Sequence, residues 1–123
     1  MKAIVTDDSK ATRMILAKLM RDLGFEVREA ETGARLLELL DEAICDVCLV
    51  DWNMPRMNGT QVMRTLQAHP DWREIPAVIV TDETRTERIA GALEAGAVGY
   101  LGKPFKVESL KGILIEAGVP FAE

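Results

Sequence analysis

Along this chain, short runs of β-branched residues alternate with longer amphipathic stretches. Each short run has the length and composition of a buried strand, whereas each longer stretch repeats apolar residues at helical spacing. This alternation is typical of a parallel sheet that is covered by helices on both faces. It predicts five strands, at Ala3–Thr6, Glu26–Ala30, Val47–Asp51, Ala77–Thr81 and Gly99–Gly102.

The amphipathic stretches predict five helices, one after each strand. The first extends from about residue 10 to residue 23, with Ser9 as its N-cap and Gly24 as the left-handed residue that ends it. Thr32 caps the second helix, and the third covers Thr60–Ala68. The second helix turns leucines toward the core: Leu36, Leu37, Leu39 and Leu40.

A capping box, Thr84-Arg85-Thr86-Glu87, predicts the start of the fourth helix, and Gly96 predicts its end. The fifth helix turns four residues inward: Leu110, Ile113, Leu114 and Ala117. Because strand-helix-strand crossovers are right-handed, these elements predict a three-layer, doubly wound α/β sandwich. The length of 123 residues predicts a single domain over residues 1–123.

Charge and composition exclude several classes of partner. A formal net charge of −5 leaves no basic stripe to neutralise nucleic-acid phosphates, so direct nucleic-acid binding is not expected. No apolar run reaches a membrane-spanning length and no signal peptide precedes the first strand, so we expect a cytoplasmic protein without membrane contact. Cys45 and Cys48 form a C-x-x-C spacing, but a strand would hold their Cα atoms about 10 Å apart, too far for a disulfide. We expect reduced packing residues.

Polar residues follow the carboxyl ends of four predicted strands. They are Asp7, Asp8, Asp51, Thr81, Asp82 and Lys103. Ligands of open α/β sheets bind at this edge, where the strand order reverses. Carboxylates gathered there repel one another by about 1 to 4 kcal/mol a pair unless a cation lies among them. An all-oxygen donor set favours Mg²⁺, whereas zinc would need Cys or His clusters that the sequence lacks.

A carboxylate beside Mg²⁺, with a lysine and a hydroxyl nearby, provides the groups that phosphoryl transfer requires. Asp51 is then the candidate nucleophile. The chain has neither a G-x-x-x-x-G-K-[ST] loop nor a G-x-G-x-x-G turn, so we expect the phosphoryl group to come from another donor than a bound nucleotide.

Four groups of residues together resemble the response-regulator receiver family of two-component signalling, in the order and spacing of that family. They are Asp7-Asp8, the segment Leu49-Val50-Asp51-Trp52-Asn53-Met54-Pro55-Arg56-Met57-Asn58-Gly59, Thr81, and Lys103-Pro104-Phe105. The resemblance covers essentially the whole chain. It implies a flavodoxin-like fold with strand order 2-1-3-4-5 and a chemotaxis-type, single-domain regulator.

The resemblance also implies a role for each residue at the site. Asp51 would accept phosphate from a histidine kinase, and Asp8, Asp51 and the main-chain carbonyl of Asn53 would contact Mg²⁺, with Asp7 acting mainly through water. Lys103 would hold a phosphoryl oxygen and would be followed by a cis peptide bond. Such a protein is a phosphoacceptor switch that catalyses its own phosphorylation and dephosphorylation, and is not otherwise an enzyme.

The same resemblance implies a switch and an output face. Thr81 would move toward the phosphoryl group, and the ring of Tyr100 would turn inward. The face formed by the fourth helix, fifth strand and fifth helix, around Arg88, Tyr100 and Lys106, would bind a downstream target protein. We expect a monomer, with a dimer possible on phosphorylation.

One residue departs from the family pattern, which has a small residue after the threonine: this chain has Asp82 there. Asp82 and Glu83 follow Thr81 here and add negative charge at the mouth of the site. The hypothesis is that Asp82 modulates the chemistry, through a water-mediated metal contact or by screening the acyl phosphate. Trp52 is expected in that mouth, Trp72 as a packing or surface residue, and His69 as a solvated loop residue without a partner.

Three alternatives stay open. The chain could be a receiver cut from a longer transcription factor, although the ending at residues 118–123 carries no linker and favours a stand-alone regulator. A haloacid-dehalogenase-type phosphatase also forms an aspartyl phosphate, but it needs an aspartate where this chain has Asn53 and carries its nucleophile on the first strand. A phosphorylation-independent interaction module would not need the complete acidic set.

Overall fold

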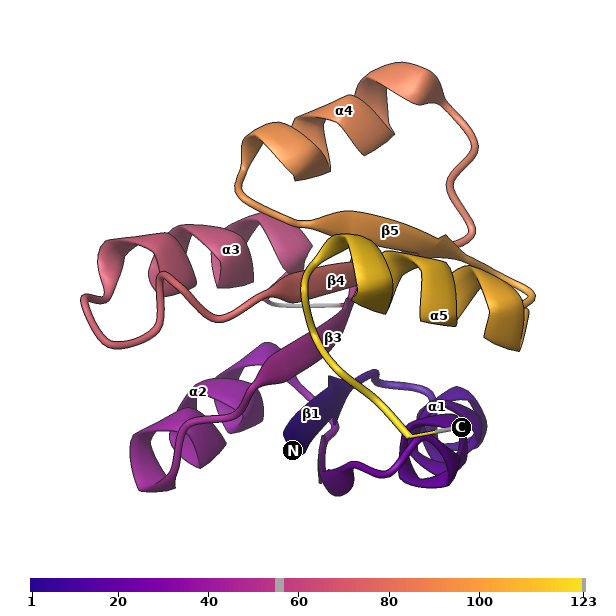
Figure 1. Ribbon diagram of the computed structural model, residues 1–123. Helices are drawn as coiled ribbons and strands as arrows, with labels where there is room; N and C mark the ends of the chain where they lie inside the picture. Colours follow the sequence, from indigo (N-terminus) through magenta and orange to yellow (C-terminus); the bar gives the residue numbers. More distant parts are fainter. Residues whose placement is uncertain (55–56, 123) are drawn as a thin grey trace.

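The computed structural model describes residues 1–54 and 57–122, so Pro55 and Arg56 of the predicted loop lie outside the described residues. Over these residues the chain forms a parallel sheet in the order β2-β1-β3-β4-β5, covered by five helices (Figure 1). The strands are β1 (Lys2–Thr6), β2 (Glu26–Ala30), β3 (Val47–Asp51), β4 (Ala77–Thr81) and β5 (Gly99–Gly102). The predicted fold class and strand order are confirmed.

The helices are α1 (Lys10–Asp22), α2 (Gly33–Glu42), α3 (Gly59–Ala68), α4 (Thr86–Glu94) and α5 (Val107–Glu116). The core residues of α1 and α5 pack on one face of the sheet, and those of α2, α3 and α4 pack on the other (Figure 1). Within the described residues, no helix combines the length and hydropathy that a membrane span requires.

Local capping explains where three helices begin. The Ser9 side chain accepts a hydrogen bond from the Thr12 amide at 3.3 Å, and Thr32 caps α2 in the same way, both as predicted. Gly24 follows α1 with φ of +92°, a conformation in which a side chain would be strained. The helix α3 begins one residue earlier than predicted because Asn58 and Gln61 form a capping box.

The predicted capping box at the start of α4 is wrong. The helix begins at Thr86, its N-cap is Arg85, and no side chain makes a capping hydrogen bond there. The nearby charges are engaged elsewhere: the Glu83 carboxylate lies 2.7 Å from Nε of Arg85 and 3.2 Å from Nε of Arg88. The turn before α4 is therefore held by ion pairs instead of by the Thr84 hydroxyl.

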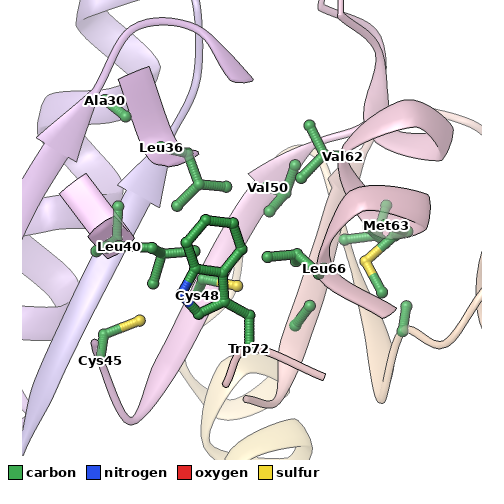
Figure 2. Close-up of a cluster of buried hydrophobic side chains, with 14 of the residues drawn as sticks. Ala30, Leu36, Leu40, Cys45, Cys48, Val50, Val62, Met63, Leu66 and Trp72 are labelled. Atoms are coloured by element: carbon green, nitrogen blue, oxygen red, sulfur yellow. The ribbon is translucent and has the colours of Figure 1, made fainter. Parts of the chain in front are cut away.

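The indole of Trp72 fills the core between α2, α3 and β3. Figure 2 shows this ring beside Leu40, Cys48 and Leu66, and only 8% of Trp72 is exposed. Cys45 and Cys48 are buried and free, as predicted.

The expectation that His69 is a solvated residue without a partner is wrong. Its ring is half-buried and stacks on Trp72, with 3.7 Å between centroids, and its Nδ1 accepts a hydrogen bond from the amide of Asp71. These contacts join His69 to the packing of the α3–β4 loop.

Candidate functional site

Three carboxylates meet at the carboxyl ends of β1 and of β3, which is the central strand of the sheet. One oxygen each from Asp7, Asp8 and Asp51 lies within 4.8 Å of the others. Asp7 is fully buried and Asp51 is 4% exposed, while Asp8 is exposed. The cluster therefore has a buried base and one side that is open to solvent.

Lys103 is the cation that the structure brings to this cluster. Its Nζ lies 3.5 Å from Oδ2 of Asp7 and 3.6 Å from Oδ1 of Asp51. The main chain fixes its position, because the Lys103 amide donates a 2.9 Å hydrogen bond to the carbonyl of Thr81. The Lys103–Pro104 peptide bond is cis, as predicted.

Burial raises the pKa of Asp51 from 3.8 to about 6. The neighbouring charge of Asp7 adds to this rise, whereas Lys103 and the amide of Asn53 lower the pKa. That amide donates to Oδ1 of Asp51 at 3.3 Å. Without a further cation, the site therefore holds more negative charge than its own residues compensate.

The donor set fits a hard divalent cation. Oδ1 of Asp7 accepts a 2.8 Å hydrogen bond from the Ser9 amide, but Oδ2 is buried without a hydrogen-bond partner. Such an oxygen is costly unless a charge or a metal compensates it, and the ammonium of Lys103, which lies 3.5 Å away, is shared with Asp51. With oxygens from Asp8 and Asp51 close by, the arrangement suits Mg²⁺, which prefers oxygen ligands and keeps part of its water shell.

Thr81 and Tyr100 lie on β4 and β5, the two strands that follow β3 in the sheet. Thr81 ends β4 and is 3% exposed, and its Oγ1 accepts a 2.9 Å hydrogen bond from the amide of Glu83. Tyr100, on β5, is 43% exposed. The two side chains border one small cavity beneath α4.

The two additional acidic residues behave differently from each other. Asp82 is exposed and its Oδ1 accepts a 3.5 Å hydrogen bond from Nδ2 of Asn53, at the mouth of the site. The Glu83 carboxylate instead pairs with Arg85 and Arg88. Among the residues that the structure describes, no ion pair of Asp82 is found, so of these two residues it is Asp82 that adds negative charge near Asp51.

The predicted output residues are exposed. Arg88 lies on α4, Tyr100 on β5 and Lys106 at the start of α5. Trp52, expected in the mouth of the site, is half-buried, and its ring packs so closely on Gly59 that a Cβ there would lie 2.1 Å away. The sequence did not single out Arg85 or the inward pairing of Arg88, because a spacing of two or five residues across a turn carries no periodic signal.

Sequence and structure comparisons agree on one family. A family model for the response regulator receiver domain matches residues 3–115. The chain is 38% identical over 112 residues to the chemotaxis protein CheY of Pseudomonas aeruginosa, covering 90% of each protein. It is 40% identical over 113 residues to the chemotaxis protein CheY1 of Helicobacter pylori, covering 90% of this chain and 91% of that protein.

Solved structures give the same result. The chemotaxis protein CheY4 of Vibrio cholerae matches with a TM-score of 0.87 at 31% identity, over 94% of this chain and 97% of that one. A putative response regulator from Chloroflexus aurantiacus matches in fold, with a TM-score of 0.88 at 24% identity, over 95% of this chain and 97% of that one. The chain therefore belongs to the response-regulator receiver family of two-component signalling.

Proposed function

We propose that this receiver is a phosphorylation-operated switch in which Asp51 accepts a phosphoryl group from a histidine kinase. The observation that carries the proposal is the position of Lys103, whose ammonium lies between the carboxylates of Asp7 and Asp51 at 3.5 and 3.6 Å. A cation held there is placed to neutralise a phosphoryl oxygen on Asp51.

Mg²⁺ is the proposed cofactor. Asp8, Asp51 and the main-chain carbonyl of Asn53 would hold it directly, and Asp7 would act mainly through water. When bound, the ion neutralises negative charge on the transferring phosphoryl group and orients it. Oδ2 of Asp7 is buried, accepts no hydrogen bond from the described residues and shares the ammonium of Lys103 with Asp51, which favours a further cation at this place.

The proposed chemistry is nucleophilic displacement at phosphorus. A carboxylate oxygen of Asp51 attacks, a P–O bond forms, and the P–N bond to the donor histidine breaks with its electron pair remaining on the imidazole nitrogen. Water later attacks the acyl phosphate, and phosphate leaves as the carboxylate is restored. Lys103 and the Thr81 hydroxyl would hold separate phosphoryl oxygens during both steps.

The proposed response begins with Thr81. Its hydroxyl would leave the amide of Glu83 and move toward the phosphoryl group, and the exposed ring of Tyr100 would then turn inward. This movement would change the α4, β5 and α5 face around Arg88, Tyr100 and Lys106, to which a target protein binds.

Asp82 is proposed to slow the chemistry. Its carboxylate lies beside Asn53 and adds negative charge where a phosphodonor or an attacking water must enter. Asp82→Ala should raise the rates of phosphorylation and dephosphorylation, and Asp82→Asn should separate the effect of charge from that of size. Unchanged rates in both variants would remove Asp82 from the mechanism.

The similarity to chemotaxis proteins over about 90% of their length supports a stand-alone, cytoplasmic regulator built as one domain over residues 1–123. It does not favour a fragment of a transcription factor or a haloacid-dehalogenase-type phosphatase. We propose a monomer at rest, with dimer formation on phosphorylation as the outcome to test by light scattering.

The decisive experiment is phosphorylation by a small donor. The protein is incubated with acetyl phosphate or phosphoramidate and Mg²⁺, and intact mass is measured beside Asp51→Asn. We expect one added phosphoryl group that requires Mg²⁺ and is absent from the variant. Equal incorporation by Asp51→Asn would refute the assignment of the nucleophile.

A further inference from the structure

The loop between β4 and α4 is held by one carboxylate. Oε1 of Glu83 lies 2.7 Å from Nε of Arg85 and 3.2 Å from Nε of Arg88. The Glu83 side chain is 18% exposed, whereas those of Arg85 and Arg88 are 56% and 59% exposed. The carboxylate is therefore turned inward and covered by two arginines at the start of α4.

The same residue contacts Thr81 through its main chain. The Glu83 amide donates a 2.9 Å hydrogen bond to Oγ1 of Thr81. The ion pairs that hold the Glu83 side chain against Arg85 and Arg88 also restrain this amide, because both groups are attached to the same Cα. The Thr81 hydroxyl is thus connected to Arg85 and Arg88 through Glu83.

The space beneath α4 shows what this connection opposes. A cavity of about 10 Å³ remains between the helix and the sheet, which is room for about one water. Its lining includes Thr81, Glu83, Arg88, Ile89 and Tyr100. We expect the ring of Tyr100 to turn into this space only when α4 or the loop before it shifts.

We propose that Arg85 and Arg88 are positioning residues that hold the switch at rest by fixing Glu83, and through it Thr81. We call the three residues Glu83, Arg85 and Arg88 the resting clamp. The inference rests on the proposed function, since the clamp regulates the response of Thr81 and Tyr100 to a phosphoryl group. It gives Arg88 an inward role in addition to its place on the output face.

The clamp also defines the kind of partner that releases it. A target that places carboxylates against the start of α4 competes with Glu83 for Arg85 and Arg88. Binding of such an acidic segment and phosphorylation of Asp51 each require the clamp to open. The two events therefore favour each other.

Tyr100 provides the readout because it is the only tyrosine in the sequence. Protein that contains 3-fluorotyrosine gives a ¹⁹F signal from this ring alone, and beryllium fluoride with Mg²⁺ serves as the phosphoryl mimic. The measurement is the beryllium fluoride concentration at half-maximal change of the signal. Arg64→Gln is the matched control, because no ion pair of Arg64 is found among the residues that the structure describes.

We expect Arg85→Gln/Arg88→Gln and Glu83→Gln each to lower this concentration by about two- to fivefold, the range expected for partly exposed ion pairs. The triple variant should show no larger change than either, because all three remove the same contacts. Added NaCl should lower the value in the wild type but not in Glu83→Gln, since salt screens the pairs.

Two results would overturn the clamp: variants that respond like Arg64→Gln, or effects of the arginine and glutamate substitutions that add in full. Circular dichroism of each variant checks that a changed response does not come from unfolding. A wild-type protein whose Tyr100 signal ignores beryllium fluoride would instead refute the proposed function, and with it any role of the clamp in switching.

Discussion

At the carboxyl ends of the strands, Asp7 and Asp51 are buried close together and share one lysine. At the amino end of β3, by contrast, the buried side chains include the uncharged thiols of Cys45 and Cys48. Polar groups near the amino edge are satisfied: the Arg28 guanidinium donates to the carbonyls of Leu39 and Ala43 at the end of α2. The polar groups at the amino end therefore compensate one another, whereas the clustered carboxylates at the carboxyl end repel one another and oppose folding. The difference shows that the site is maintained at a cost to stability.

The largest expected loss of stability comes from the apolar core, away from the charged carboxyl end. Leu49 lies in the middle of β3 with no exposed surface. Leu49→Ala should lower the free energy of unfolding by about 2–5 kcal/mol, because it leaves a cavity in a packed layer. Urea denaturation measures the loss, and a loss below about 1 kcal/mol would show that the layer collapses around the smaller residue.

Metal binding should relieve the repulsion at the carboxyl edge. At a hundredfold excess over its dissociation constant, Mg²⁺ should stabilise the fold by about 2.7 kcal/mol relative to protein in chelator. Thermal unfolding in both conditions measures this gain. Asp8→Asn removes an exposed, proposed ligand without opening the core and should weaken this gain. Equal melting temperatures for the wild type in Mg²⁺ and chelator would contradict a metal site.

Removing the charge of Asp51 should stabilise the metal-free protein. Because the pKa in the folded state is about 6 instead of 3.8, the folded state binds more protons than the unfolded state between these values. Wild-type stability should therefore fall as pH rises from about 4 to about 6, and Asp51→Asn should lack this component. We expect the variant to be more stable by about 1–3 kcal/mol at pH 7. Urea denaturation across pH measures the difference, and parallel pH curves would contradict it.

The smallest expected loss of stability concerns the hydrogen bonds of Arg28 near the amino ends of the strands. Arg28→Met keeps much of the aliphatic stem but removes the donors that reach the last carbonyls of α2, so it should cost about 1–2 kcal/mol. Arg64→Met is the control on an exposed helix surface, where we expect a change within about 0.5 kcal/mol. Equal stability of the two variants would mean that water replaces the guanidinium without loss.

Periodic features were predicted well from the sequence. The strands β1, β3 and β4 were predicted because buried parallel strands are apolar runs rich in β-branched residues, and the positions of Asp51 and Thr81 followed from where those runs stop. The strands β2 and β5 lack such runs and were predicted from the alternation of strands with helices. Ser9 and Thr32 were recognised as caps because their hydrogen bonds depend on residues three positions away. The grouping of Asp7, Asp8 and Asp51 followed from their places at the carboxyl ends of predicted parallel strands.

Contacts that depend on tertiary packing were not predicted. Thr84 has the spacing of a cap, but the ion pairs of Glu83 set the start of α4 one residue later. The stacking of His69 on Trp72 depends on how the α3–β4 loop meets the core, which no local pattern records. The roles of the site residues remain predictions.

The buried thiols offer a practical route to observing the proposed switch. Burial raises the pKa of Cys45 to about 11 and raises that of Cys48 as well, so both stay protonated at neutral pH and react slowly with maleimides. A cysteine introduced on the surface can therefore take a fluorophore selectively while both native cysteines remain in place. Energy transfer from the two tryptophans, Trp52 and Trp72, to such a label on α4 would then report the movement of that helix in ensembles.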